Sequence, residues 1–169
     1  MNRNVEVKAR VEDLAAVRER AEKLADEGPI IVKQEDTFFV CARGRLKLRQ
    51  LPNSAEGELI YYERPDAAEP KESRYVVHRT SDPRGVHGLL SVALGERGVV
   101  RKRRTLYFVG STRVHLDEVE GLGDFIELEV VLEPEQDAAD GVATAQKLMR
   151  QLGVGPTELI DKAYIDLLE

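Results

Sequence analysis

Residues 101–130 read RKRRTLYFVGSTRVHLDEVEGLGDFIELEV, and charged residues alternate with apolar ones along much of this stretch. A period of two places the charges on one face of a β-strand and the apolar side chains on the other. Glycines at 110, 121 and 123 mark two turns. The stretch therefore predicts three consecutive antiparallel strands, each with a charged face, over 98–110, 112–119 and 125–133.

The rest of the chain adds strands and helices around this block. Patterns of period two, or β-branched and aromatic runs, predict further strands over 5–10, 30–41, 44–51, 59–64 and 74–80. Helical spacing predicts an amphipathic helix within 12–28 that Asp13 caps, and further helices over 87–95, 136–152 and 157–168. About eight short strands with hairpin-like turns favour closure into a barrel, which removes exposed sheet edges. We expect an α+β fold, an eight-stranded antiparallel β-barrel with helices packed outside, in one domain spanning 1–169.

Composition limits the class of protein. The chain has 169 residues, 33% charged and 42% hydrophobic, which suits one domain with a sizeable core. No apolar run approaches the roughly 18 residues of a membrane span, and the N-terminus lacks the apolar stretch of a secretory signal. The single cysteine, Cys41, excludes an internal disulfide and a cysteine metal cluster. We expect a cytoplasmic protein with no membrane partner, and the net charge of −6 argues against nucleic acid.

The charged faces decide what the barrel does. A solvated polar face is common in antiparallel sheets and explains any one strand taken alone. Across five strands, however, the repeating face is almost purely ionic, and cationic strands are segregated from anionic ones: Glu6 and Lys8; Arg45, Lys47 and Arg49; Lys102 and Arg104; Arg113, His115 and Asp117; Glu127 and Glu129. The alternative is a barrel whose charges point inward. Since unpaired buried charges are very costly, such an interior must be wet and filled by ions of matching charge.

Both charged rows then fit one kind of ligand. Arg and Lys side chains bind phosphate oxygens well, so the basic rows favour a polyphosphate. Carboxylate rows favour hard divalent cations, Mg²⁺ or Mn²⁺, which commonly bridge to phosphates. The pattern predicts a metal-polyphosphate site within the barrel.

Four segments resemble the CYTH family, also called triphosphate tunnel metalloenzymes: EVKAR (6–10), GRLKLR (44–49), the 101–130 block and AYIDLL (163–168). The family includes class IV adenylate cyclases, thiamine triphosphatases and inorganic triphosphatases. The resemblance covers nearly the whole chain in the expected order. It implies a tunnel of eight antiparallel strands that binds a triphosphate and one or two divalent metals. The family's N-terminal Glu-x-Glu-x-Lys falls on 4–8, with Asn4 in place of the first Glu and an uncharged carbonyl oxygen in place of a carboxylate.

The resemblance also implies roles for individual residues. Metal ligands would be Glu6, Asp117, Glu127 and Glu129, with Glu6, Lys8 and Asp117 as the catalytic set. Triphosphate contacts would be Lys8, Arg45, Lys47, Arg49, Arg64, Arg74, Lys102, Arg104, Arg113 and Tyr164. Arg64 is a shifted substitute for a family lysine, and Tyr164 matches an aromatic that can close one tunnel end. Arg74 fits a tunnel position or an outer pair with Glu72 equally well, and His115 fits a structural histidine at least as well as a general base.

These expectations lead to several functions. The leading one is divalent-metal-dependent hydrolysis of a triphosphate, whether inorganic tripolyphosphate, a nucleoside triphosphate or thiamine triphosphate. Close behind is the class IV adenylate cyclase reaction, from ATP to cyclic AMP and pyrophosphate. Asn4 motivates a non-catalytic polyphosphate or nucleotide binder. Binding of 5′-triphosphate RNA ends is a further alternative, against which the net charge counts. The resemblance also allows a homodimer.

Overall fold

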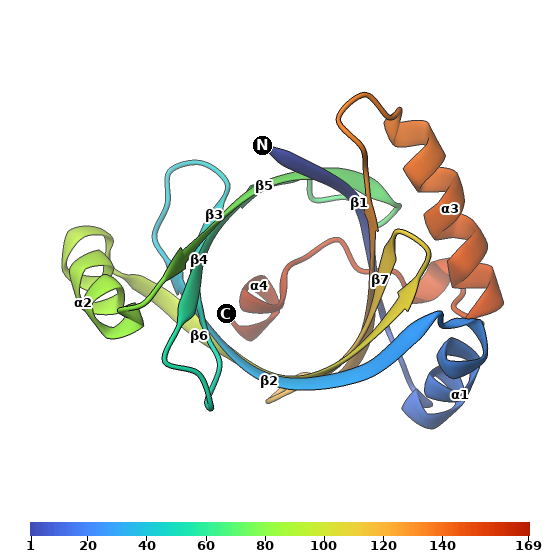
Figure 1. Ribbon diagram of the computed structural model, residues 1–169, viewed down its shortest axis with the longest axis horizontal. Helices are drawn as coiled ribbons and strands as arrows, with labels where there is room; N and C mark the ends of the chain where they lie inside the picture. The colour runs from blue at the N-terminus through green and yellow to red at the C-terminus, as the bar shows by residue number, and fades with distance from the viewer.

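The computed structural model describes all 169 residues and shows the expected closed antiparallel barrel (Figure 1). Around the ring the strands follow the order β1-β5-β4-β3-β2-β6-β7-β8, and β8 pairs with β1 to close it. The eight strands are β1 Asn2–Arg10, β2 Glu27–Phe39, β3 Arg45–Gln50, β4 Gly57–Glu63, β5 Lys71–Thr80, β6 Glu96–Val109, β7 Thr112–Val119 and β8 Gly123–Val131. The prediction of an eight-stranded antiparallel barrel is confirmed.

Apolar residues on the outer face of the barrel pack against two helices. On β1, Val5, Val7 and Ala9 are almost fully buried and belong to a cluster of 17 buried hydrophobic residues. Helices α1 (Leu14–Leu24) and α3 (Ala138–Gln151) add Val17, Ala21, Ala145, Leu148 and Met149 to this cluster and cover β1, β7 and β8 from outside (Figure 1). Burying one such aliphatic side chain stabilises the fold by about 1.5–3 kcal/mol. The alternating residues of these strands must therefore face inward.

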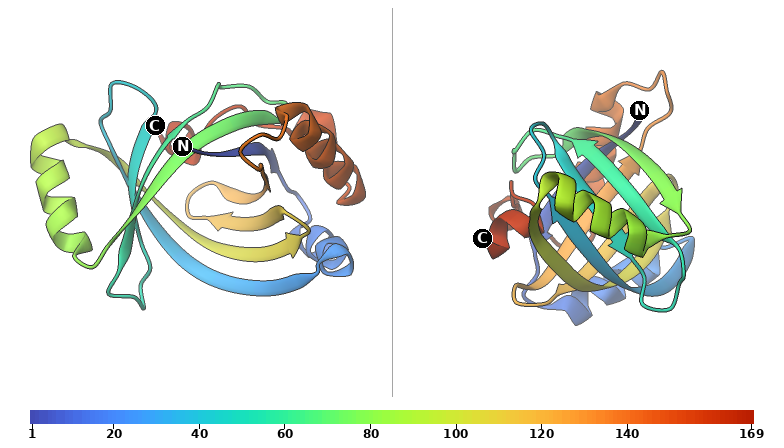
Figure 2. Two further views of the ribbon diagram at one scale, coloured as in Figure 1. Left: turned by 45° about the horizontal axis from the view of Figure 1, so that its top comes forward. Right: turned by 90° about the vertical axis from the view of Figure 1, so that its left-hand side faces the viewer.

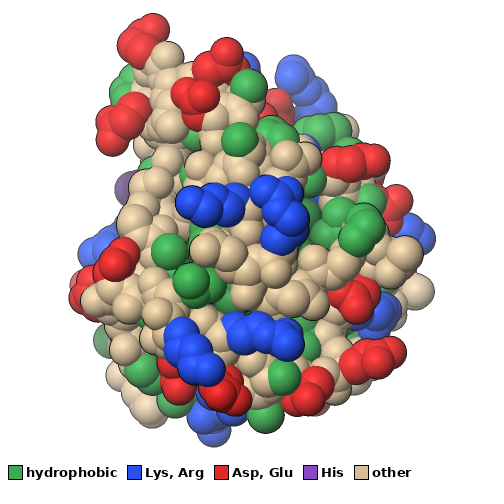
Figure 3. Space-filling model, turned by 90° about the vertical axis from the view of Figure 1, so that its right-hand side faces the viewer, with side chains coloured by type: hydrophobic (Ala, Val, Ile, Leu, Met, Phe, Trp, Pro, Cys, Tyr) green, Lys and Arg blue, Asp and Glu red, His purple; other side chains and the backbone are tan.

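The first helix begins as expected and ends earlier. The Asp13 side chain accepts a hydrogen bond from the backbone N–H of Ala16 at 3.1 Å, which caps α1. The helix stops at Leu24, because Ala25 is already extended and β2 starts to pair with β6 at Glu27. The surface that α1 and α3 form carries Lys and Arg side chains interspersed with Asp and Glu (Figure 3).

Helix α2 (Pro83–Leu94) lies on the opposite side of the barrel and projects away from it (Figure 2). Asp82 caps it through the backbone N–H of Gly85, and none of its residues is buried. None of the helices is both long and apolar enough to cross a membrane.

The C-terminal segment differs from the helix predicted over 157–168. A 3-10 turn, η1 (Pro156–Glu158), is followed by an extended stretch whose Ile160 N–H bonds to the Lys8 carbonyl, and only α4 (Tyr164–Leu168) is helical. Pairing with β1 replaces helical hydrogen bonds along that stretch. Helix α4 consequently lies across the opening of the ring (Figure 1), where its buried residues pack with Phe38 and Phe125.

Candidate functional site

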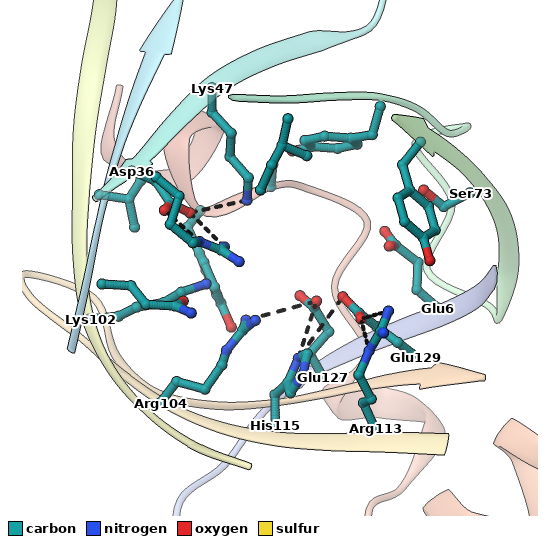
Figure 4. Close-up of a pocket in the computed structure, with 18 of the residues that line it drawn as sticks. Glu6, Asp36, Lys47, Ser73, Lys102, Arg104, Arg113, His115, Glu127 and Glu129 are labelled. Atoms are coloured by element: carbon teal, nitrogen blue, oxygen red, sulfur yellow. Dashed lines mark hydrogen bonds and ion pairs between the residues drawn. The ribbon is translucent and has the colours of Figure 1, made fainter. Parts of the chain in front are cut away.

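The barrel interior encloses a cavity of about 430 Å³ lined by 26 residues. Most of the residues predicted for the site line this cavity: Glu6, Lys8, Lys47, Arg49, Arg64, Lys102, Arg104, Arg113, Glu127, Glu129 and Tyr164. Those that Figure 4 labels point into one space from different strands. The prediction that the charged faces point inward is confirmed.

One wall of the cavity is basic and is organised by a buried acid. Asp36 on β2 accepts hydrogen bonds from Arg49 at 2.8 and 2.9 Å and from Lys47 at 3.0 Å. Strand β2 lies between β3 and β6, so Asp36 is flanked by cations on both sides. Burial alone would raise the pKa of Asp36, but Arg49 and Lys47 hold it well below its usual range. Asp36 therefore stays ionised and fixes the orientation of its partners.

Asp117 likewise fixes the orientation of the cations that β6 contributes to this wall. Arg104 donates to both of its oxygens at 2.7 Å, and Lys102 lies 3.5 Å away. Burial would raise the pKa of Asp117, but Arg104 and Lys102 lower it. Burial next to Arg104 in turn lowers the pKa of Lys102 to about 7. An anion in the cavity would favour its protonated form.

Tyr164 brings the C-terminal helix into the same network. Its hydroxyl donates to Asp117 at 2.8 Å, and its ring packs edge-on against Phe125. The Lys8 ammonium lies 3.8 Å from the centre of the Tyr164 ring, within cation–π range. The ring and α4 thus form the floor of one end of the cavity.

The opposite, acidic wall carries Glu6 of β1 and Glu127 and Glu129 of β8, with Arg113 and His115 of β7 beside them. Glu127 and Glu129 alternate along β8, and Glu6 pairs in register with Glu129. Lys8 lies 3.4 Å from Glu127, and Arg113 donates to Glu129 at 2.9 Å. Figure 4 shows these carboxylates facing the basic wall across the cavity.

Two carboxylates of this wall differ in charge state. Burial alone would raise the pKa of Glu127, but Lys8 keeps it well below its usual range. Burial and the neighbouring Glu127 raise the pKa of Glu6 to about 7, although Arg64 lies 2.7 Å from it. The three glutamates of this wall are each paired with a cation, Lys8, Arg64 or Arg113, so a divalent ion bound here would share their carboxylates with these side chains.

These residues fit a divalent cation. Ligand atoms of Glu127, Glu129 and His115 lie within 4.8 Å of one another. Glu127 and Glu129 offer hard oxygen ligands, which Mg²⁺ and Mn²⁺ accept. Such an ion would lie between the acidic wall and a phosphate group on the basic wall.

Three predicted residues do not line the cavity. Asp117 has both oxygens engaged by Arg104 and Tyr164 and is fully buried, so it supports the wall and is not available as a metal ligand. Arg45 donates to Asp166 of α4 at 2.7 Å and to Asp66 at 3.1 Å. Its role is to anchor the C-terminal helix.

Arg74 lies outside the barrel. The residues on either side of it, Ser73 and Tyr75, face the cavity, so alternation turns Arg74 outward. Its side chain is 61% exposed and lies 3.2 Å from Glu72. Of the two positions that the sequence allowed for Arg74, the structure shows the outer one, paired with Glu72.

The cavity also contains residues that the sequence did not single out. Asp36, Tyr62 and Tyr75 line it, and His115, expected to point inward, does so. Residues 33–37 read KQEDT and are all polar, so period two does not distinguish Asp36 from its neighbours in this strand. Tyr62 and Tyr75 pair across β4 and β5, and the charge pattern could not reveal them because they carry no charge.

Comparisons with known proteins agree with this geometry. A family model described as the CYTH domain matches residues 2–164. The adenylate cyclase CyaB of Aeromonas hydrophila is 27% identical, with 78% of this chain and 82% of that protein covered. The PH1012 protein of Pyrococcus horikoshii OT3 has a TM-score of 0.86 at 28% identity, covering 97% of this chain and 98% of that one. HpAC1 from Hippeastrum, described as having a dominant triphosphatase activity, has a TM-score of 0.61 at 19% identity, covering 95% and 91% of the two chains.

Proposed function

We propose, since this chain belongs to the CYTH domain family, that it is a divalent-metal-dependent enzyme that hydrolyses a triphosphate inside its barrel. The single observation that carries the proposal is the division of one cavity into a basic and an acidic wall. Lys47, Arg49, Lys102 and Arg104 lie on one side, and Glu6, Glu127 and Glu129 lie on the other. A linear polyphosphate with a bridging cation complements both walls.

The basic wall would hold the phosphate chain. Asp36 and Asp117 fix Arg49 and Arg104 before any ligand arrives, so little side-chain entropy is lost on binding. Lys102 gains a proton when phosphate approaches, because its pKa of about 7 rises beside an anion. Fixed positive charge at this wall also stabilises charge that develops on phosphate oxygens in the transition state.

Glu127 and Glu129 would hold the cation opposite the basic wall. When bound, a divalent ion neutralises phosphate charge and lowers the pKa of a coordinated water. Glu6, with its pKa near 7, can accept a proton from a nearby water at neutral pH. In hydrolysis, water attacks the terminal phosphorus and the bond to the bridging oxygen breaks. The rest of the chain leaves as the diphosphate, and the terminal phosphoryl group is released with the water oxygen as orthophosphate.

Adenylate cyclisation is the second candidate, and similarity to CyaB of Aeromonas hydrophila favours it. The same walls would hold the triphosphate of ATP, while the ribose 3′-hydroxyl would attack the α-phosphorus and release pyrophosphate. The two reactions differ in which phosphorus meets the nucleophile. Tyr62 and Tyr75 offer aromatic surface in the same cavity for a base or another organic group.

Product analysis by ³¹P NMR tests the proposal. The purified protein is incubated separately with tripolyphosphate, ATP and thiamine triphosphate, each with Mg²⁺ and with Mn²⁺. Orthophosphate from any of them supports hydrolysis and identifies the preferred substrate. Cyclic AMP with pyrophosphate establishes the cyclase instead. Tight triphosphate binding without product would contradict an enzymatic role and favour a binding protein that lacks the carboxylate replaced by Asn4.

A further inference from the structure

We propose that Nδ1 of His115 is a metal ligand beside Glu127 and Glu129, so that the acidic wall selects a first-row transition ion such as Mn²⁺ over Mg²⁺. The inference rests on the metal-dependent function proposed above. It adds a nitrogen donor that the sequence pattern did not assign to the metal.

His115 is held in place at the acidic wall. It lies on β7 directly opposite Glu127 of β8 in the antiparallel register, and both side chains face the cavity. Only 5% of its side chain is exposed. Figure 4 shows the imidazole pointing toward the two glutamates.

The Nδ1 atom of His115 is buried and makes no hydrogen bond. It lies 3.8 Å from Oε1 of Glu127 and 3.9 Å from Oε1 of Glu129, and both distances exceed the roughly 3.2 Å limit of a normal hydrogen bond. A buried polar atom without a partner is costly, and native structures rarely contain one without a reason. An ion shared with Glu127 and Glu129 would give Nδ1 the partner that it lacks.

The distances match a coordination sphere. The three donor atoms lie within 4.8 Å of one another. Ligands bound at about 2.1 Å are separated by about 3 Å when adjacent and about 4.2 Å when opposite. The 3.8 and 3.9 Å from Nδ1 to the two glutamate oxygens fall between these values, so small side-chain movements bring Nδ1 and either carboxylate onto one ion.

The donor set determines the class of ion. Mg²⁺ prefers oxygen ligands in near-ideal octahedral geometry and keeps several waters. Imidazole is a ligand of transition ions, whose affinity for nitrogen-containing sites rises along the series that begins with Mn²⁺. One imidazole nitrogen among carboxylate oxygens therefore weakens the preference for Mg²⁺.

Pulsed EPR of the Mn²⁺-loaded protein tests the assignment directly. Electron spin echo modulation from a directly coordinated imidazole nitrogen is expected, and it should change when the protein is produced with ¹⁵N-histidine. The sequence contains only three histidines. His115→Gln should remove the modulation, and the matched control His78→Gln, at an exposed position of β5, should retain it. The labelled wild-type protein gives the answer even if His115→Gln does not fold.

Calorimetric titration gives the second readout. His115→Gln should weaken Mn²⁺ binding by about tenfold or more, the size of loss that even outer partners of metal sites produce, and weaken Mg²⁺ binding much less. Two results would overturn the inference and leave the proposed function standing. One is that Mn²⁺ binds without nitrogen coupling, and the other is that the coupling persists in His115→Gln. Absence of any divalent-ion binding, with or without tripolyphosphate, would overturn both.

Discussion

Arg104 on β6 and Asp117 on β7 lie opposite each other in register and form a bidentate ion pair, with both nitrogen–oxygen distances at 2.7 Å. The same carboxylate accepts the hydroxyl of Tyr164 from the C-terminal helix. One buried acid thus connects the basic wall of the cavity with the segment that closes its end. The basic wall is rigid because its anions are built into the barrel.

Asp117→Asn should destabilise the protein by about 3–5 kcal/mol, because Arg104 and Lys102 would remain buried without their anion. Urea denaturation measures the change. Glu118→Gln is the matched control: this neighbour faces outward, pairs with Arg103 at an exposed position, and should change stability by less than about 1 kcal/mol. Equal losses in the two variants would refute a special role for Asp117.

Arg49→Ala and Arg74→Ala should differ in triphosphate binding. Arg49 lines the cavity, and a lost charge-assisted contact of about 1.5–3 kcal/mol weakens affinity for tripolyphosphate by roughly 10- to 100-fold. Arg74 points outward beside Glu72, so its removal should leave affinity unchanged. Isothermal titration with tripolyphosphate compares them, and a comparable loss from Arg74→Ala would show that binding takes place outside the barrel.

The pH dependence of stability should report Glu6. Its folded-state pKa of about 7 lies above the unfolded value of 4.5, so the folded protein keeps a proton that the unfolded chain releases. Stability from this group is therefore present below about pH 4.5 and is lost as the pH rises through 7.

Glu6→Gln should remove this loss of stability at rising pH. The free energy of unfolding, measured with chelator between pH 4.5 and 7.5, should fall less steeply in the variant, by an amount on the order of 2 kcal/mol. His115, whose pKa Glu6 does not set, titrates in both proteins and cancels in the comparison, whereas the pKa of Lys71, which Glu6 raises, falls in the variant. Parallel curves for the two proteins would mean that Glu6 ionises normally in the barrel.

Alternation in the sequence was sufficient to predict the barrel and most of its inner surface. Strand faces follow directly from period two, and so Lys47, Arg49, Glu127 and Glu129 point where they were expected. Alternation in the sequence does not show which residue, distant in the chain, a charged side chain pairs with. Arg45 shares a strand face with Lys47, yet Asp166 from the other end of the chain draws it to α4.

The C-terminal segment illustrates the same limit. Residues 157–168 have helical spacing, but backbone pairing of Ile160 with β1 and burial of Tyr164 in the cavity outweigh helix propensity. Asp36 was overlooked for a related reason, since its partners Lys47 and Arg49 become neighbours only when β2 and β3 pair. Local patterns predict strands and faces, whereas partner choice depends on tertiary contacts.

The most direct test of a metal-dependent site in the barrel is phosphate release by the double variant Glu127→Gln with Glu129→Gln. With tripolyphosphate and Mn²⁺, its rate should fall by at least about 100-fold, because Gln preserves side-chain shape and removes the charges that would hold the ion. The variant also removes the anionic partners of Lys8 and Arg113, so circular dichroism is recorded alongside to show that the barrel is intact. The control Glu133→Gln with Glu135→Gln, at exposed positions beyond β8, should keep the wild-type rate. Wild-type phosphate release from the Glu127 and Glu129 double variant would contradict the assignment of these carboxylates and, with it, the proposed metal-dependent chemistry inside the barrel.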